Sequence, residues 1–284
     1  MKKALLTVAI LATCVAAMAQ TRAVTGDVNG DGFVTTTDAT MIYNYLLTGD
    51  QTFYSTSDVN GDGSVTVADV TLIYNIILGV SPVVEHEYVD LGLPSGTLWA
   101  TMNVGATTPE ECGDYFAWGE TTPMDYNPYW DTYQWSNGKW NKLTKYCTGS
   151  NYGDNGFVDG KTELDPEDDA AYVNWGSQWR MPSYDQMEEL RTKCTWQWKT
   201  SNGVNGYLVK SKSNGASLFL PVTDYYSTGQ IYNAGYMGYY WSRTLHTTPY
   251  KAYYLFFYSS SNLECTNGDR YSGFAVRAVK APQK

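Results

Sequence analysis

Apolar residues recur with helical spacing in two segments near the N-terminal end of the chain. The second segment repeats the first at an offset of 31 residues. The first contains Met41, Ile42, Tyr45, Leu46 and Leu47, and the second contains Leu72, Ile73, Ile76, Ile77 and Leu78. The spacing predicts two amphipathic helices, and each pattern stops at a glycine, Gly49 or Gly79, where a helix commonly ends.

From residue 88 onward the pattern changes to short runs rich in aromatic and β-branched residues, separated by Gly, Asn, Ser and Pro. Such runs predict strands. The candidates are residues 206–210, 217–221, 239–243, 252–258 and 274–279. One helix is predicted after Ser183, a good N-cap, with acids near its start and Arg191 and Lys193 near its end. We expect an α+β domain with a mostly antiparallel sheet.

The first residues have the pattern of an export signal. Two lysines precede an apolar run over residues 4–16 and a small-residue stretch that ends at Ala19, which predicts a signal peptide, residues 1–19, cleaved after Ala19. No later stretch is long enough to cross a bilayer, so the mature chain is expected to lack a transmembrane segment and to be secreted or held at the cell surface. Lipidation at Cys14 is an alternative, which the bulky Thr13 and the apolar residues after Cys14 disfavour.

Composition excludes several classes of function. Cleavage removes two lysines and moves the formal charge from −10 to −12, which argues against a nucleic-acid partner. His86 and His246 are the two histidines of the chain, too few for a histidine-based zinc site or a Ser-His triad to be built easily. Four cysteines survive cleavage and could pair in three ways or not at all. They are Cys112, Cys147, Cys194 and Cys265.

A polar hexapeptide precedes each apolar segment and repeats with the same offset. Asp-Val-Asn-Gly-Asp-Gly begins at Asp27 and again at Asp58. Calcium takes about six to eight oxygen ligands, and a twelve-residue loop supplies them from positions 1, 3, 5, 7, 9 and 12. Gly32 and Gly63 occupy position 6, where such a loop bends sharply. One such loop could be a solvated turn, but two in register favour metal binding.

Each loop is therefore predicted to hold one calcium ion. The first ion's ligands are Asp27, Asn29, Asp31, the carbonyl of Phe33, Thr35 and Asp38. The second ion's ligands are Asp58, Asn60, Asp62, the carbonyl of Ser64, Thr66 and Asp69. A module of this size buries little apolar surface, so the metal is expected to contribute much of its folding free energy.

Aspartate at position 12 and the lack of an evident helix entering either loop depart from the EF-hand pattern. A loop with an exiting helix, duplicated within residues 26–80, resembles the dockerin type I family. The resemblance implies a small all-α fold of two loop–helix repeats, two calcium ions, and docking onto a cohesin-like scaffold protein, often in assemblies that degrade polysaccharides.

The resemblance also implies which residues face the partner. Tyr43-Asn44 and Tyr74-Asn75 repeat with the 31-residue offset and would present near-identical faces. Alternatively, both tyrosines cover the core of the module itself. Loop positions 10 and 11, which the family uses for partner choice, are occupied by different pairs in the two repeats, which argues against equivalent use of both faces. These pairs are Thr36-Thr37 and Val67-Ala68.

Residues 81–87 are predicted to be a linker, because Pro82 discourages helix continuation. From Tyr88 to Ala100 the chain resembles the opening of the Fibrobacter succinogenes major paralogous domain. Further blocks follow in that family's order and extend the resemblance over residues 88–281. They are 168–171, 175–176, 179–183, 219–221, 240–242 and 276–277. The Trp-Arg-Met-Pro-Ser block is also similar to one in C-type-lectin-like folds, which implies a lectin-like fold.

Aromatic and acidic residues are the candidates for chemistry in this second domain. Trp130, Trp135 and Trp140 are candidates for stacking on sugars, whereas tryptophans inside the resemblance blocks are expected in the core. The acids from Asp165 to Asp169 could bind a metal or act as acid and base, although a turn-capping role is favoured. A glycosidase needs two carboxylates across a cleft, and sequence alone shows no such pair.

The sequence thus predicts a secreted, non-catalytic interaction protein. A calcium-dependent docking module would carry a carbohydrate-binding or adhesive domain, linked to extracellular polysaccharide degradation. Two alternatives remain: a glycoside hydrolase delivered by its docking module, and a surface adhesin or structural protein with no cohesin partner. The lack of a recognisable catalytic signature favours the first interpretation.

Overall fold

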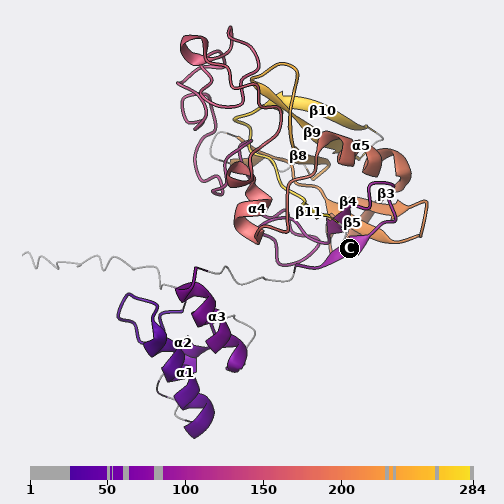
Figure 1. Cartoon of the computed structure of the whole chain (residues 1–284). Coiled ribbons are helices and arrows are strands. Elements are labelled where there is room, and N and C mark those ends of the chain that lie inside the picture. The colour runs from indigo at the N-terminus through magenta and orange to yellow at the C-terminus, as the bar shows by residue number, and fades with distance from the viewer. Residues whose placement is uncertain are drawn as a thin grey trace, which may run out of the picture. The chain divides into compact units, whose positions relative to one another are not determined.

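The computed structural model describes residues 26–49, 52, 54–59, 64–79, 86–227, 230–232, 235–259 and 262–281. The chain divides into two compact units, Met1–Pro82 and Val83–Lys284 (Figure 1). The predicted signal peptide, Cys14 and most of the predicted linker lie outside the described residues. No helix within the described ranges is both long and apolar enough to cross a membrane.

The described residues of the first unit form the α-helices α1 (Thr36–Thr48), α2 (Tyr54–Ser57) and α3 (Val67–Ile77). The two long helices begin at threonine N-caps, and in each a capping box pairs the threonine with the aspartate three residues later. Gly49 ends α1 in the left-handed conformation with φ 74°. The single turn α2 leads into the second loop, where the sequence pattern had predicted no entering helix.

The core of the first unit lies between α1 and α3. Its fully buried residues are Val28, Ala39, Ile42, Val70 and Ile73. Ala39 and Val70, like Ile42 and Ile73, are related by the 31-residue offset, so the two repeats contribute equivalent positions to one shared core. Neither helix could bury its apolar face alone, which is the physical reason for the duplication.

The second unit is built from small antiparallel sheets. Within the described residues, strands pair in the orders β1-β2-β11, β3-β4-β5, β8-β9-β10 and β6-β7, all antiparallel. The strands are β1 (Tyr88–Asp90), β2 (Leu98–Ala100), β3 (Cys194–Ser201), β4 (Val204–Ser211), β5 (Ser217–Pro221), β6 (Tyr225–Ser227), β7 (Gln230–Tyr232), β8 (Met237–Leu245), β9 (Lys251–Tyr258), β10 (Leu263–Asp269) and β11 (Val279–Lys280).

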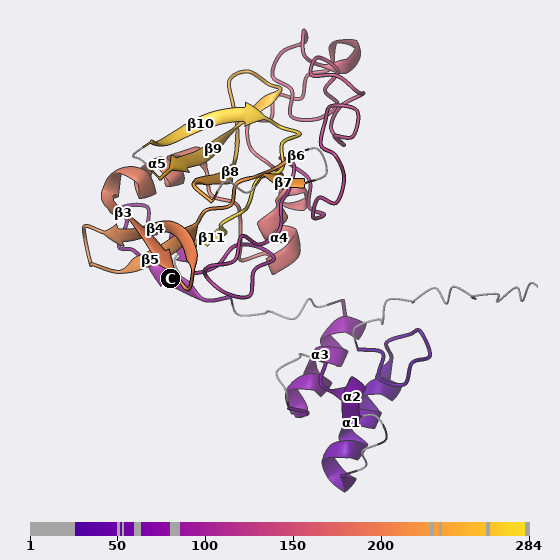
Figure 2. The same cartoon turned by 180° about the vertical axis from the view of Figure 1, so that it is seen from behind.

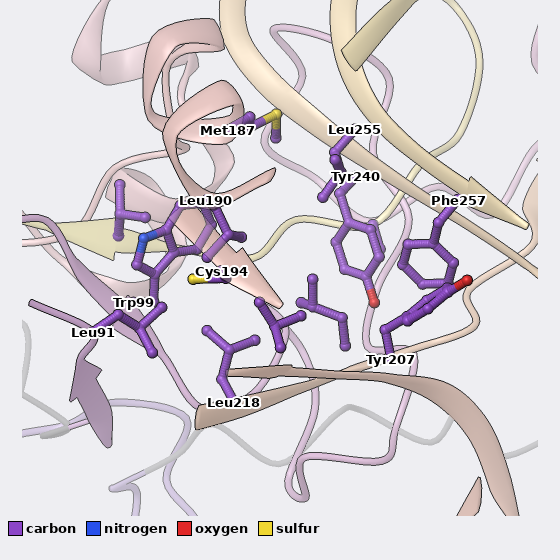
Figure 3. Close-up of a cluster of buried hydrophobic side chains, with 14 of the residues drawn as sticks. Leu91, Trp99, Met187, Leu190, Cys194, Tyr207, Leu218, Tyr240, Leu255 and Phe257 are labelled. Atoms are coloured by element: carbon purple, nitrogen blue, oxygen red, sulfur yellow. The ribbon is translucent and has the colours of Figure 1, made fainter. Parts of the chain in front are cut away.

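Two α-helices accompany these strands, α4 (Ala170–Trp175) and α5 (Tyr184–Lys193). Helix α5 begins at the predicted N-cap Ser183 and runs directly into β3 (Figure 2). Its buried residues Met187 and Leu190 face a core shared with Trp99, Tyr240 and other side chains of the sheets (Figure 3). This core joins the beginning, middle and end of the second unit's sequence into one domain.

A long segment between β2 and α4 contains only two short 3₁₀ helices, η2 (Asp154–Gly156) and η3 (Pro166–Asp168). It is ordered by side chains rather than by a sheet: residues from Tyr115 to Cys147 form a separate aromatic core, in which Tyr133 and Leu143 are almost fully buried. The buried Arg270 fastens this segment to the sheets by donating hydrogen bonds to Tyr133 and to main-chain carbonyls.

Four of the five predicted strands lie in β4, β5, β8 and β9. The predicted strand over residues 274–279 was wrong, since only Val279–Lys280 belongs to a strand. Phe274 pairs with Phe116, Ala275 with Tyr239 and Tyr240, and Val276 with Val104, so successive residues bond to different segments. The run of aromatic and β-branched residues indicated an extended chain, but it could not indicate a shared partner strand.

Candidate metal and docking site

The first predicted calcium loop folds around the carboxylate of Asp27. That carboxylate accepts hydrogen bonds from the amides of Gly30 at 2.8 Å, Asp31 at 3.1 Å and Gly32 at 2.8 Å. The side chain of Asn29 donates to that of Asp31 at 2.8 Å. Gly32 has φ 88°, a left-handed conformation that explains glycine at loop position 6. Predicted ligands at positions 1, 3 and 5 are therefore brought together.

Asp38, the predicted ligand at position 12, is fully buried. It accepts hydrogen bonds from the amides of Val28 and Thr35, both at 2.8 Å, and of Asn29 at 3.2 Å. Burial acts to raise the pKa of Asp38, but these amide hydrogen bonds outweigh it and hold the pKa below its usual value. The carboxylate thus links the start of the loop to the first turn of α1, while Phe33 at position 7 is exposed.

The second loop repeats this arrangement where it is described. Asp69 is fully buried and accepts hydrogen bonds from the amides of Val59 and Thr66, both at 2.8 Å. The predicted ligands Asn60 and Asp62 lie outside the described residues. The equivalent use of Asp38 and Asp69 shows that the 31-residue repeat extends to hydrogen bonding.

The charge of this module has no internal counterion. Residues 26–80 contain seven aspartates and no Lys, Arg, His or Glu. Among the described residues, no three Asp, Glu, His or Cys side chains could hold a metal by themselves. The remaining predicted donors are amide, hydroxyl and main-chain oxygens, so the donor set contains only oxygen and suits a hard cation such as calcium.

Exposed apolar residues gather on α1 and α3 of this unit. They occur in pairs related by the 31-residue offset: Tyr43 and Tyr74 are 43% and 40% exposed, and Leu47 and Leu78 are 81% and 72% exposed. Leu46 and Ile77 form a third pair. Contiguous patches of exposed apolar residues are typical of surfaces that bind a partner.

The residues predicted to face a partner lie on the same helices. Of the eight, only Asn75 is half-buried, and the others are exposed. The exposed ones are Thr36, Thr37, Tyr43, Asn44, Val67, Ala68 and Tyr74. Neither tyrosine is among the buried or partly buried residues of the unit's described core.

The three tryptophans predicted to stack on sugars differ in exposure. Trp130 is 6% exposed and belongs to the aromatic core, so its ring has little surface to offer. Trp135 is half-buried, donates its ring N–H to the Gly119 carbonyl at 2.7 Å and has Lys145 Nζ 4.9 Å from its ring. Trp140 is 46% exposed and is the ring best placed to meet a ligand.

Trp140 belongs to a chain of six neighbouring rings that we call the aromatic cluster. Successive ring centroids lie 5.1 to 6.2 Å apart. Their order is Tyr129, Tyr271, Trp130, Tyr250, Trp140 and Tyr152. Tyr129 is 57% exposed, so the cluster reaches solvent at two places. The two exposed rings are 11 residues apart, and the tyrosines that connect them come from distant parts of the sequence.

Three of the four acids from Asp165 to Asp169 are engaged in structural contacts, and the fourth, Glu167, is exposed. Lys145 Nζ lies 3.2 Å from Asp165 and 2.5 Å from Asp168. Asp169 caps α4 and accepts a hydrogen bond from Arg180 Nε at 2.8 Å. These pairs occupy the carboxylates, in accord with the capping interpretation rather than with a metal or an acid–base pair.

The four cysteines beyond the first unit are free thiols in the structure. Cys147 and Cys194 are buried, and Cys112 and Cys265 are partly exposed. Burial raises the pKa of Cys194 to about 11, so its thiol is protonated and unreactive at neutral pH. The described part of the chain therefore holds together without a disulfide.

Comparison with known proteins identifies the first unit. The model of the dockerin type I domain family matches residues 25–78. No curated protein and no solved structure matches the chain. Dockerin type I domains in general bind calcium, dock onto cohesins and occur typically in extracellular proteins. The loops and helices described above are therefore those of a dockerin type I domain.

Proposed function

We propose that this chain is a secreted interaction protein that docks onto a cohesin-bearing scaffold through residues 26–79, with two calcium ions bound. The remainder of the chain is the cargo, and it binds carbohydrate in the context of extracellular polysaccharide degradation. The observation that carries docking is the set of exposed apolar residues on α1 and α3, repeated at the same offset as the loops.

Calcium has a structural role in this proposal. The predicted ligands at loop positions 1 to 9, together with Asp38 and Asp69 at position 12, would hold the two ions. Bound calcium supplies positive charge to a module that has none of its own. Each loop leads into the N-terminus of a long helix, so closing the loops positions the two helices that carry the exposed apolar pairs.

Replacing both exposed leucines by lysine, Leu47→Lys with Leu78→Lys, is expected to abolish binding to a cohesin module. Both side chains are largely exposed, so the unfolding midpoint should change little. Two lost contacts at the centre of an interface should weaken binding by about 100-fold or more. Binding of the full chain to a panel of purified cohesin modules, by surface plasmon resonance in calcium, measures the effect.

The matched control is Val173→Lys, which replaces an exposed apolar residue on α4 of the second unit. It should leave cohesin binding unchanged. If the double variant binds as well as the unaltered chain, the exposed apolar pairs are not the docking surface. If no cohesin in the panel binds either chain, the adhesin alternative, with no cohesin partner, takes precedence.

The aromatic cluster supports a carbohydrate-binding role for the second unit. Trp140 and Tyr129 offer exposed ring faces, and aromatic rings combine an apolar face with polar edges that suit sugars. The membership of residues 88–281 in the Fibrobacter succinogenes major paralogous domain family, and a C-type-lectin-like fold, are part of this proposal. They rest on the sequence blocks, of which the buried Trp99, Trp179 and Trp241 are core members.

Trp140→Ala is expected to weaken retention of the full chain by polysaccharides, by about tenfold for the loss of one stacked ring. Affinity electrophoresis against a polysaccharide panel measures it. Phe157→Ala is the control, because Phe157 is exposed but outside the aromatic cluster. Equal retention of the Trp140→Ala and Phe157→Ala variants would contradict a role for the aromatic cluster in carbohydrate binding. Release of reducing sugar from the polysaccharide would favour the hydrolase alternative.

A further inference from the structure

The second unit contains a cavity that takes part neither in docking nor in the aromatic cluster. The cavity, of about 620 Å³, lies beside the turn between β3 and β4, close to the end of β5. This volume falls within the range of about 300–1,000 Å³ that small-molecule sites occupy. Its walls include Glu110, Glu111, Cys112, Asn205, Val222 and Asp224.

Hydrogen bonds fasten the walls of this cavity to one another. The carboxylate of Glu110 accepts from Ser201 at 2.7 Å and from Asn202 at 3.1 Å, which ties the 108–115 loop to the β3–β4 turn. Cys112 Sγ donates to the carbonyl of Val222 at 3.2 Å, which ties the same loop to the end of β5. The cavity therefore has fixed walls before any ligand enters.

Asp224 and Asn205 hydrogen-bond to Gly235, which forms the remaining wall of the cavity. The Asp224 carboxylate accepts from the amide of Gly235 at 3.2 Å, and Asn205 donates to the Gly235 carbonyl at 3.2 Å. Asp224 is 3% exposed and has φ 50°, an uncommon conformation for a residue with a side chain. The fold thus keeps an acidic side chain in the wall despite burial and backbone strain.

The charged side chains described in the cavity lining are all acidic. Glu110, Glu111 and Asp224 contribute carboxylates, and none of the described residues in the lining is Lys, Arg or His. The amide of Thr107 and its hydroxyl hydrogen-bond to Glu111 and lower the pKa of that carboxyl, so it is charged at neutral pH. Anions are repelled from such a cavity, and cations are attracted to it.

We propose that this cavity binds a small organic cation that carries a primary ammonium group. An ammonium has three N–H donors and no acceptor, which matches carboxylate and amide oxygens. A bare metal ion fits less well, because the described Asp, Glu, Cys and His side chains form no group of three that could hold one. The apolar surfaces of Val204 and Val222 can pack against the carbon skeleton of the ligand.

Calorimetric titration of the full chain, in calcium buffer, tests this site with four probes. D-glucosamine and lysine amide carry the ammonium on a sugar and on an amino acid, and whichever binds identifies the source. N-acetyl-D-glucosamine and Nα,Nε-diacetyl-lysine amide are the matched probes, and neither of them carries an ammonium group. We expect at least one amine to bind, its acetylated match to bind about tenfold more weakly or not at all, and the affinity to fall with added salt.

Asp224→Asn and Glu110→Gln should each weaken amine binding by about tenfold, the effect of losing one charged hydrogen bond. The matched control Glu167→Gln removes an exposed charge outside the cavity and should have no effect. Glu110→Gln keeps the test valid if Asp224→Asn fails to fold. Failure of both amines to bind, or equal binding of their acetylated matches, would overturn the proposal, and neither result depends on docking or on polysaccharide binding.

Cys112 allows an independent measurement without changing any carboxylate. Its thiol lines the cavity, and burial, with the nearby Asp224 charge, raises the pKa of that thiol. Methanethiosulfonate reagents with an ammonium or a sulfonate tail react with the thiolate form of a cysteine, so both label Cys112 slowly and their two rates can be compared. We expect the cationic reagent to label Cys112 at least tenfold faster than the anionic one, relative to a free cysteine standard. Equal relative rates would contradict the proposal.

Discussion

Chelation of calcium from the full chain is expected to unfold the first unit and to leave the second unit folded. The first unit has seven aspartates and no basic residue between positions 26 and 80. Its described core contains only five fully buried apolar residues. A core this small contributes little stability, and the uncompensated carboxylates repel one another once the metal leaves.

Two spectroscopic signals separate the units. All ten tryptophans lie at or beyond Trp99, so tryptophan fluorescence reports on the second unit alone. The long helices α1 and α3 belong to the first unit, so EDTA should reduce the far-UV helical signal without changing the fluorescence. At a calcium concentration 100 times the dissociation constant, each bound ion adds about 2.7 kcal/mol to the free energy of unfolding. Adding excess calcium after EDTA should therefore restore the helical signal.

Substitutions within the loops should reproduce the effect of chelation. Asp27→Asn and Asp58→Asn each remove one predicted calcium ligand, and each should lower calcium affinity in a direct titration. Asp50→Asn is the control, because it removes the same charge from the sequence between the two loops. If EDTA changes neither the helical signal nor the unfolding midpoint, the metal has no structural role in this unit.

Arg270→Met is expected to destabilise the second unit by about 3–5 kcal/mol, as for other buried charged groups whose partners lose their hydrogen bonds. Arg270 is fully buried and has no carboxylate partner within hydrogen-bond distance among the described residues. Its guanidinium donates to Tyr133 at 2.8 Å and to the carbonyls of Lys145, Tyr146 and Pro249 at 3.0 to 3.1 Å. Methionine fills part of the space but leaves these acceptors unpaired.

Denaturant unfolding followed by tryptophan fluorescence measures this loss. Arg191→Met is the control, since Arg191 forms a partly exposed pair with Glu188 on α5 at 2.8 Å, and such pairs contribute less than about 1 kcal/mol. The guanidinium of Arg270 also lies 4.9 Å from the Trp118 ring, so its loss should alter the fluorescence of the folded state. Similar unfolding midpoints for Arg270→Met and Arg191→Met would show that the hydrogen bonds of Arg270 contribute little to the stability of the second unit.

Local patterns predicted much of the secondary structure. The repeat, the two long helices and the N-cap at Ser183 all depend on neighbours within a few residues, which sequence spacing reflects directly. The same holds for β4, β5, β8 and β9, whose runs of aromatic and β-branched residues are bounded by turn residues. Helix α4 was missed because it has only six residues, although Asp169 as its N-cap was a usable signal.

Those local patterns could not predict which segments distant in the sequence pack or hydrogen-bond together. Residues 274–279 are extended, but each finds a different partner segment. Trp130 is near Trp140 in sequence and in a similar polar context, yet it is buried by contacts with Tyr250 and Tyr271, far along the chain. The cavity with Asp224 in its wall likewise joins three segments that no spacing rule connects.

By itself, the sequence determined the dockerin type I module: its repeated loops, the helices that follow them and its unbalanced negative charge are local and compositional properties. Tertiary structure alone decided which tryptophans are exposed, which acids are already paired with lysine or arginine, and where three carboxylates share the wall of one cavity. The physical reason is that burial and charge pairing depend on packing between distant segments, and packing follows from the whole chain rather than from any single stretch of it.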